Sequence, residues 1–256
     1  GGLWGVGGGG GGGGPGNLKE YQELFYAHDK LQGGFIWEWF DHGIESVTDN
    51  GEVYYRYGGD FGDDPSNKDF CIDGMLMPDR TPSPSLYEYK KVIEPITTSA
   101  IDVLSGEFSL LSRFDFENLA IFNLVYTITE DQTVIQSGTV SVPAIAAREE
   151  GRLHLPYHLD FPKKAGAAYY LTLSYQLKET TAYASAGHEL ATAQFELPIT
   201  TPGIEITPVG LLMAKEIGPH LYIEGPNFSI NFDKVKGALT NVTRDGKKLL
   251  HKGPKF

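Results

Sequence analysis

The sequence predicts a multidomain fold that joins α/β and all-β structure: the end of a (β/α)8 barrel, an immunoglobulin-like β-sandwich, and the first strands of a further β-sandwich domain. Three patterns along the 256 residues support this prediction. Residues 17–97 show a helix, a strand, a long loop and a second helix, which is the order expected in the last turn of such a barrel. Residues 98–202 carry short runs of alternating apolar and polar residues, and residues 203–256 carry more of them.

Residues 1–16 stand apart from the predicted domains because glycine dominates them. The eight consecutive glycines Gly7–Gly14 have no side chains to bury and a high entropic cost of ordering. We interpret the segment as an artefact of sequence reading or, alternatively, as a natural flexible linker.

The first predicted domain, residues 17–97, begins with a helix over residues 18–28, where apolar residues recur at helical spacing. Asn17 precedes it and is a residue type that caps helix N-termini. The apolar run at residues 31–39 predicts a buried strand. A loop rich in glycine, aspartate and proline follows, and residues 85–93 predict a short helix that a proline ends.

The second predicted domain, residues 98–202, has the pattern of an all-β sandwich. Its apolar residues recur with a period near two, and turn residues separate the runs. The predicted strands are Phe108–Phe114, Phe122–Ile128, Val134–Ile135, Arg152–Leu155, Tyr169–Tyr175 and Gln194–Leu197.

The third predicted region, residues 203–256, contains the first strands of a further β-domain, and the sequence stops early in that domain. The strand patterns are Leu221–Gly225, Asn227–Phe232, Leu239–Thr240 and Lys248–Leu250.

Composition excludes some classes of partner and leaves the compartment open. The net charge of −12 argues against binding to nucleic acid or to an anionic membrane surface. No apolar run reaches the roughly 20 residues that a membrane-spanning helix needs. Cys71 is the single cysteine and can form no internal disulfide, so it does not indicate a redox compartment. We expect a soluble protein of either the cytoplasm or the periplasm, with an N-terminus that is truncated.

The most informative stretch is Leu31–Val92, in which aromatic residues, glycines and acids follow one another in a distinctive order. It contains Phe35–Trp37 and then Glu38–Asp41, and further on Gly58–Asp63 and Phe70–Gly74. Aromatic faces suit the apolar side of a sugar ring, and carboxylates or carbonyls suit its hydroxyls or a metal. The order closely resembles the last part of the catalytic barrel of the large β-galactosidases of glycoside hydrolase family 2.

This resemblance implies a substrate and one of its contacts. The family hydrolyses terminal non-reducing β-D-galactose residues with retention of configuration, so a β-galactoside is the implied partner. Trp37 matches the tryptophan whose ring lies against galactose, at the end of the eighth barrel strand, where the active sites of such barrels cluster. From the residues alone, the alternative is a tryptophan packed in the barrel core.

The resemblance also implies a cation site. Phe70 and Asp73 match a pair that helps to bind a monovalent cation, Na⁺ or K⁺, beside the 6-hydroxyl of the sugar, with the Phe70 backbone carbonyl as one ligand and its ring lining the sugar pocket. Trp37, Phe70 and Asp73 are therefore the expected substrate-binding residues. Asp73 stands where asparagine is common, and a carboxylate is also a good ligand for a hard cation. The alternative is a carboxylate that caps the turn before Gly74. The family also binds Mg²⁺, but this chain lacks the residues that hold it, and the whole enzyme is expected to be a homo-oligomer.

The same resemblance leaves no catalytic residue to assign. Retaining glycosidases need two carboxylic acids about 5 Å apart. In the family the nucleophilic glutamate lies shortly before the stretch matched by Gly16–Tyr21, where this chain has the glycine-rich residues 5–14, and the acid/base glutamate lies further upstream. We therefore expect a C-terminal fragment that is inactive by itself.

Two alternative functions stay open. One is a non-catalytic carbohydrate-binding or interaction module, which would need an exposed aromatic platform in residues 98–200. The other is a different glycosidase of the family, a β-glucuronidase or β-mannosidase, which the strings Gly58–Asp63 and Phe70–Gly74 disfavour.

Overall fold

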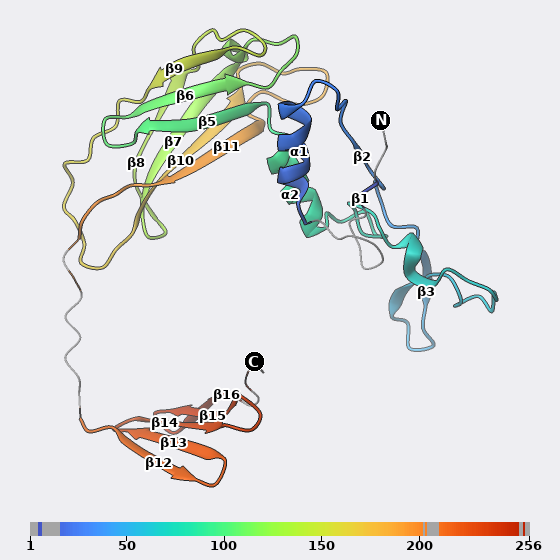
Figure 1. The fold of residues 1–256 in the computed structure, drawn as a ribbon, viewed down its shortest axis with the longest axis vertical. Helices are drawn as coiled ribbons and strands as arrows, with labels where there is room; N and C mark the ends of the chain where they lie inside the picture. The colour runs from blue at the N-terminus through green and yellow to red at the C-terminus, as the bar shows by residue number, and fades with distance from the viewer. Residues whose placement is uncertain (1–4, 7–15, 202, 204–209, 251–252, 254–256) are drawn as a thin grey trace. The chain divides into compact units, whose positions relative to one another are not determined.

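The computed structural model describes residues 5–6, 16–201, 203, 210–250 and 253. The chain forms two compact units, Gly1–Thr201 and Pro202–Phe256, and most of its regular structure is β-strand (Figure 1). The glycine run Gly7–Gly14 lies outside the described residues, and the two residues described before it form a short strand, β1 (Gly5–Val6). No helix within the described ranges has both the length and the apolar character needed to cross a bilayer.

The first unit begins with a helical region that precedes the larger sheets. The two predicted helices are confirmed as α1 (Leu18–Ala27) and α2 (Pro84–Val92), which contact each other. Ser83 is the N-cap residue of α2 and Pro84 its first helical residue, a position that suits proline. The other elements of this region are β2 (Phe35–Ile36), the antiparallel hairpin of β3 (Ile44–Val47) and β4 (Val53–Arg56), and a 3-10 helix at Lys68–Cys71.

The start of α1 differs in one detail from the sequence prediction. Asn17 occupies the N-cap position, but its φ of 65° is left-handed and its side chain makes no capping hydrogen bond. Asparagine tolerates this conformation better than most residues. The helix is instead held at this end by packing, because Leu18 is its one buried residue.

The prediction of a buried strand over residues 31–39 is wrong in this structure. The strand is limited to β2, which pairs in parallel with β1, and Phe35 is 74% exposed. A run that is apolar throughout becomes buried only where neighbouring strands and helices cover both of its faces. Those covering elements are not found among the described residues beside β2, so Phe35, Trp37 and Trp39 are exposed, while Ile36 is half-buried.

A β-sandwich forms the rest of the first unit. Its first sheet has three antiparallel strands in the order β5-β6-β9, and its second has four in the order β11-β10-β7-β8. The strands are β5 (Ile96–Asp102), β6 (Glu107–Ser112), β7 (Phe122–Glu130), β8 (Thr133–Ser141), β9 (Glu150–His154), β10 (Tyr169–Leu177) and β11 (Glu189–Glu196), with a 3-10 turn at Leu119–Ile121.

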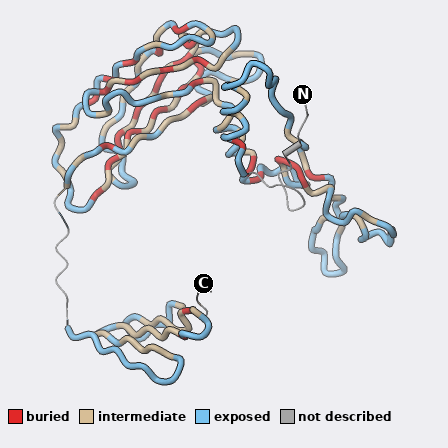
Figure 2. The backbone as a smooth tube through the Cα atoms, viewed as in Figure 1, coloured by how far each residue is buried: buried red, intermediate tan, exposed pale blue. Residues whose placement is uncertain are grey.

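The core of the sandwich follows from the period-two pattern of its strands. In β7 and β10 every second residue is buried, so one face of each strand points into the core. Phe108 and Leu110 of the first sheet share one buried cluster with Leu171 and Leu173 of the second. In Figure 2 many of the buried residues lie along these strands. The predicted strands are confirmed, while β5 was missed because its serines and threonines give little apolar alternation.

Side chains at the end of α2 attach the helical region to the sandwich. The Glu94 carboxylate accepts hydrogen bonds from the backbone N–H of Thr192 in β11 at 3.1 Å and from its hydroxyl at 3.2 Å. Lys91 Nζ lies 2.6 Å from Glu94 Oε2 and also donates to the Thr192 carbonyl. The guanidinium of Arg113 lies 4.2 Å from the ring centre of Tyr26 in α1. Because β11 is an edge strand, Glu94 bonds to backbone groups that the sheet leaves unpaired.

We expect Glu94→Ala to loosen this attachment. The Glu94 side chain is only 8% exposed, and its loss leaves the Thr192 N–H without its acceptor, at a cost of about 1–3 kcal/mol. Hydrogen exchange at the Thr192 amide should therefore be faster by about tenfold or more. Glu117→Ala, on an exposed loop residue of the sandwich, is the matched control. Equal Thr192 exchange in the two variants would contradict the predicted role of Glu94.

The second unit is a five-stranded antiparallel sheet in which each strand pairs with the next along the chain. Asp233 ends one strand, and its carboxylate accepts hydrogen bonds from the N–H groups of Val235 and Lys236, both at 3.0 Å. These bonds lower the pKa of Asp233. The strands are β12 (Met213–Ile217), β13 (His220–Gly225), β14 (Phe228–Asp233), β15 (Ala238–Arg244) and β16 (Lys247–Leu250).

Limited proteolysis should separate the stable sandwich from the rest of the chain. Almost all buried apolar side chains lie between Ile96 and Leu197, whereas Leu18 and Met75 are the buried apolar residues of the helical region among those described. Regions with few buried contacts open more readily and are cleaved first. We expect a resistant product close to residues 96–201 and early cleavage within residues 31–80, read by mass spectrometry. A resistant piece of the helical region beside a degraded sandwich would contradict this expectation.

Candidate functional site

Two stretches distant in sequence, residues 37–42 and 71–76, lie side by side and form the candidate site. The Glu38 N–H donates to the Asp73 carbonyl at 3.2 Å, and the Met75 N–H donates to the Glu38 carbonyl at 2.9 Å. The pairing continues in three more backbone hydrogen bonds: Leu76 N–H to Trp39 carbonyl (2.9 Å), Asp41 N–H to Leu76 carbonyl (2.9 Å) and His42 N–H to Cys71 carbonyl (3.0 Å).

Asp41 and Gly74 fix the closest approach of the two stretches. The Asp41 carboxylate accepts a hydrogen bond from the Gly74 N–H at 2.7 Å, in a buried setting. A Cβ atom at Gly74 would lie 2.1 Å from the Asp41 backbone nitrogen and 2.2 Å from the Phe40 carbonyl carbon. Neither atom can move aside without shifting the backbone, so this position requires glycine.

The structure places the three predicted site residues in different environments. Trp37 is 63% exposed and Phe70 is 61% exposed, whereas Asp73 is only 9% exposed. The Glu38 N–H bond to Asp73 brings Trp37 and Asp73 onto adjacent backbone segments. Phe70 lies in the 3-10 helix at Lys68–Cys71, three residues before Asp73, and within the described residues no hydrogen bond or ring contact joins it to Trp37.

The electrostatics of the site follow from burial of acids close to one another. Burial raises the pKa of Asp73, the nearby Glu38 carboxylate raises it further, and His42 acts in the opposite direction. Burial also raises the pKa of Asp41, against the Gly74 N–H bond, which lowers it. His42 Nε2 lies 3.1 Å from Glu38 Oε1, so this pair neutralises part of the negative charge when His42 is protonated.

One oxygen of the Asp73 carboxylate, Oδ1, is buried and has no hydrogen-bond partner among the described residues. A buried polar atom without a partner is costly, so such an atom marks a place for an outside donor or cation. The observation suits a cation ligand. In the part of the chain that the structure describes, no group of three or more His, Cys, Asp and Glu side chains converges on one metal position.

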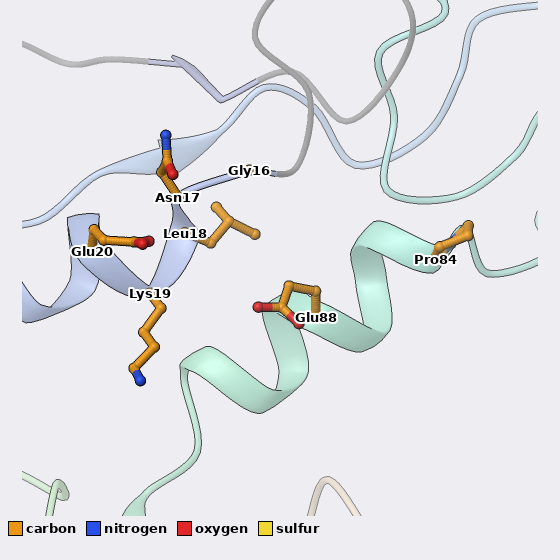
Figure 3. Close-up of a pocket in the computed structure, with 7 residues that line it drawn as sticks. All are labelled: Gly16, Asn17, Leu18, Lys19, Glu20, Pro84 and Glu88. Carbon is orange, nitrogen blue, oxygen red and sulfur yellow. The ribbon is translucent and has the colours of Figure 1, made fainter. Parts of the chain in front are cut away.

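A hollow of about 520 Å³ lies elsewhere, between the first turns of α1 and α2 (Figure 3). Figure 3 shows Leu18 of α1 and Glu88 of α2 projecting into the space between the helices. The hollow contains none of the predicted site residues, and its walls carry no aromatic ring for a sugar. Its lining residues are Gly16, Asn17, Leu18, Lys19, Glu20, Pro84 and Glu88. We therefore place the candidate site at the paired stretches and not in this hollow.

Sequence reasoning missed the features that hold the site together. The sequence patterns gave Asp41 no role beyond its place at the end of the Glu38–Asp41 string, and gave Gly74 no role beyond its place after Asp73. An acid that directly follows an aromatic string, together with a glycine next to a site carboxylate, was the available signal. The partnership of the two residues could not be read from sequence, because 32 residues separate them.

Comparisons with known proteins match two consecutive parts of the chain to family models. Residues 9–98 match the family described as "Glycosyl hydrolases family 2, TIM barrel domain", and residues 108–198 match "Beta-galactosidase, domain 4". Similar curated proteins include the β-galactosidase of Priestia megaterium, 35% identical over 240 residues, which are 93% of this chain and 23% of that protein. The β-galactosidase of Photobacterium profundum is 34% identical over 248 residues, 92% of this chain and 23% of that protein.

A third relative, the β-galactosidase of Vibrio vulnificus, is 38% identical over 184 residues, 71% of this chain and 18% of that protein. The chain thus spans less than a quarter of the length of these curated relatives. Two consecutive domains of one family match in order, and the relatives align across most of the chain. The chain therefore belongs to glycoside hydrolase family 2.

Proposed function

We propose that this chain supplies the end of the catalytic barrel and the following β-sandwich of a retaining β-galactosidase. The substrate of that enzyme is a β-galactoside, from which it hydrolyses the terminal non-reducing β-D-galactose residue and releases free galactose. The observation that carries the proposal is the backbone pairing of residues 37–42 with residues 71–76, which brings the backbone of an exposed tryptophan next to that of an aspartate with low exposure.

Trp37 and Phe70 are proposed to contact the sugar. One face of galactose gathers C–H groups into an apolar patch, and an exposed indole ring can pack against it. Trp37 offers such a ring, with 63% of its surface free in this chain. Phe70 is exposed to a similar degree and would line the same pocket from the loop that precedes Asp73.

Asp73 and the Phe70 carbonyl are proposed to hold a monovalent cation, Na⁺ or K⁺. Asp73 Oδ1 suits this role because it is buried without a hydrogen-bond partner in the described residues. When bound, the cation would supply a positive charge to a sugar hydroxyl and offset the negative charge of Asp73. Further ligands of this ion, and those of Mg²⁺, would come from outside this chain.

No carboxylate of this chain is proposed as nucleophile or acid/base. Glu38 pairs with His42 at 3.1 Å, and Asp41 is engaged with the Gly74 N–H at 2.7 Å. Glu20 lies exposed on α1. Both catalytic glutamates are proposed to come from the part of the barrel that precedes these residues in the family.

A chimeric enzyme tests the proposal. Residues 16–201 of this chain would replace the matching segment of the Priestia megaterium β-galactosidase, and hydrolysis of a chromogenic β-galactoside would be measured. We expect turnover in the chimera and no turnover above the blank with the purified 256-residue chain. A folded chimera that is inactive, or that prefers a β-glucuronide or β-mannoside, would refute the galactosidase assignment. Turnover by the chain itself would refute the assignment of both glutamates to outside residues.

A further inference from the structure

We propose that Asp41 is a positioning residue of the galactose site: through the Gly74 N–H, its carboxylate holds Asp73 in register with Trp37. This inference rests on the proposed function and extends it to a residue that contacts neither the sugar nor the cation. Its effect would be to present the indole ring and the Asp73 carboxylate to one sugar at the same time.

The position of Asp73 depends on hydrogen bonds to both polar groups of the peptide bond that joins it to Gly74. The Asp73 carbonyl accepts from the N–H of Glu38, the residue after Trp37, at 3.2 Å. One residue on, the Gly74 N–H donates to Asp41 Oδ1 at 2.7 Å. The second bond is shorter and has a carboxylate acceptor, so it is the stronger of the two. Asp41 therefore provides the stronger of the two restraints on this peptide bond.

Gly74 makes this restraint possible by its lack of a side chain. The Asp41 nitrogen and the Phe40 carbonyl carbon occupy the space where a Cβ of Gly74 would lie, at 2.1 and 2.2 Å. The backbone of Gly74 thus sits directly against the Asp41 backbone. At this distance a short aspartate side chain can reach the Gly74 N–H.

The burial of Asp41 is difficult to explain by stability. The residue is 4% exposed, and within the described residues it forms no salt bridge. Burial of a carboxylate without an ionic partner is costly. Within the described residues, the hydrogen bond that this carboxylate accepts comes from Gly74, next to the proposed site. The buried Asp41 carboxylate is costly, and its hydrogen bond restrains the residue that follows Asp73. We therefore explain its burial by the positioning of Asp73.

Asp41 also keeps the Asp73 carboxylate available. Aspartate side chains readily bond to backbone N–H groups close to them in sequence, which would occupy the oxygens needed by a ligand. Here the neighbouring Gly74 N–H is already bonded to Asp41. Asp73 Oδ1 accordingly has no partner among the described residues. Removal of the Asp41 carboxylate would free that N–H to compete for the Asp73 side chain.

The test compares Asp41→Ala with Asp41→Asn in the chimera described above. Alanine removes the acceptor, while asparagine keeps an oxygen that can accept from Gly74. We expect Asp41→Ala to raise KM for the β-galactoside by about tenfold, which is about 1.4 kcal/mol, with kcat changed much less, because the misplaced contacts act in substrate and transition state alike. Asp41→Asn should restore KM to within about threefold of the unsubstituted chimera. Asp115→Ala, which removes a surface carboxylate paired with Arg148, is the control and should leave KM unchanged.

A second measurement on the 256-residue chain needs no activity. Hydrogen exchange at the Gly74 amide, followed by NMR, should accelerate by about tenfold or more in Asp41→Ala and much less in Asp41→Asn. If Asp41→Ala lowered kcat with KM unchanged, it would act by reducing the folded fraction, and the positioning role would be refuted. An unchanged KM and an unchanged Gly74 exchange rate would refute it as well. An inactive but folded unsubstituted chimera would instead refute the proposed function, and the exchange result would still decide whether Asp41 holds Gly74.

Discussion

Phe122→Ala is expected to destabilise the β-sandwich by about 3–5 kcal/mol, the cost of removing a large aromatic side chain from a packed core. Phe122 is 0% exposed, begins β7 and stacks on Phe114 with ring centres 6.1 Å apart. Its position in the buried cluster shared by both sheets leaves little room for the cavity to collapse. Since a domain of this size is stable by only about 5–15 kcal/mol, the loss should be a large fraction of the total. Urea denaturation followed by circular dichroism would measure it.

The matched control is Phe116→Ala, six residues earlier. Phe116 is 97% exposed, so its removal leaves no cavity and should change stability by less than about 0.5 kcal/mol. Similar unfolding midpoints for the two variants would show that the sandwich core is not where the structure places it.

Trp37→Ala in the chimera is expected to lower kcat/KM for a β-galactoside. The loss of transition-state stabilisation should be about 1–3 kcal/mol, judged from the burial of an aromatic side chain. This corresponds to a decrease of roughly 5-fold to 150-fold. Trp37 is 63% exposed in this chain, and the proposal places the sugar against this exposed surface. Steady-state kinetics with the chromogenic substrate would measure the change.

Tyr183→Ala is the matched control for Trp37→Ala. Tyr183 is 66% exposed, and it lies between β10 and β11 of the sandwich, remote in sequence from the paired stretches. Its replacement should leave kcat/KM unchanged. If Trp37→Ala and the unsubstituted chimera had equal kcat/KM values, Trp37 would not be a contact of the sugar, although the galactosidase assignment would still hold.

Local patterns were sufficient to predict most of the regular elements. The helix at residues 18–28 and the strand at Tyr169–Tyr175 were both predictable, since helical spacing and strict alternation each suit one backbone geometry. The edge strand β5 was not predictable in this way, because the polar residues of Thr97–Ser99 give no clear period.

Burial was harder to predict than secondary structure for the apolar run at residues 31–39. Its composition indicated a strand covered on both faces, yet Phe35 and Trp37 are exposed in this chain. Composition shows what a segment can bury, whereas actual burial depends on which other segments lie against it. The same limit applies to Trp37, whose core and site interpretations the residues alone could not separate.

From the sequence alone came the family resemblance, the order of most helices and strands, and Trp37, Phe70 and Asp73 as candidate residues. Only the tertiary structure decided that residues 37–42 lie against residues 71–76 and that Asp73 Oδ1 is buried without a partner among the described residues. The physical reason is that periodicity and capping are local, while hydrogen bonds such as Asp41 to Gly74 join residues far apart in sequence. Their partners are set by the packing of whole segments, and this packing is where the proposed site acquires its geometry.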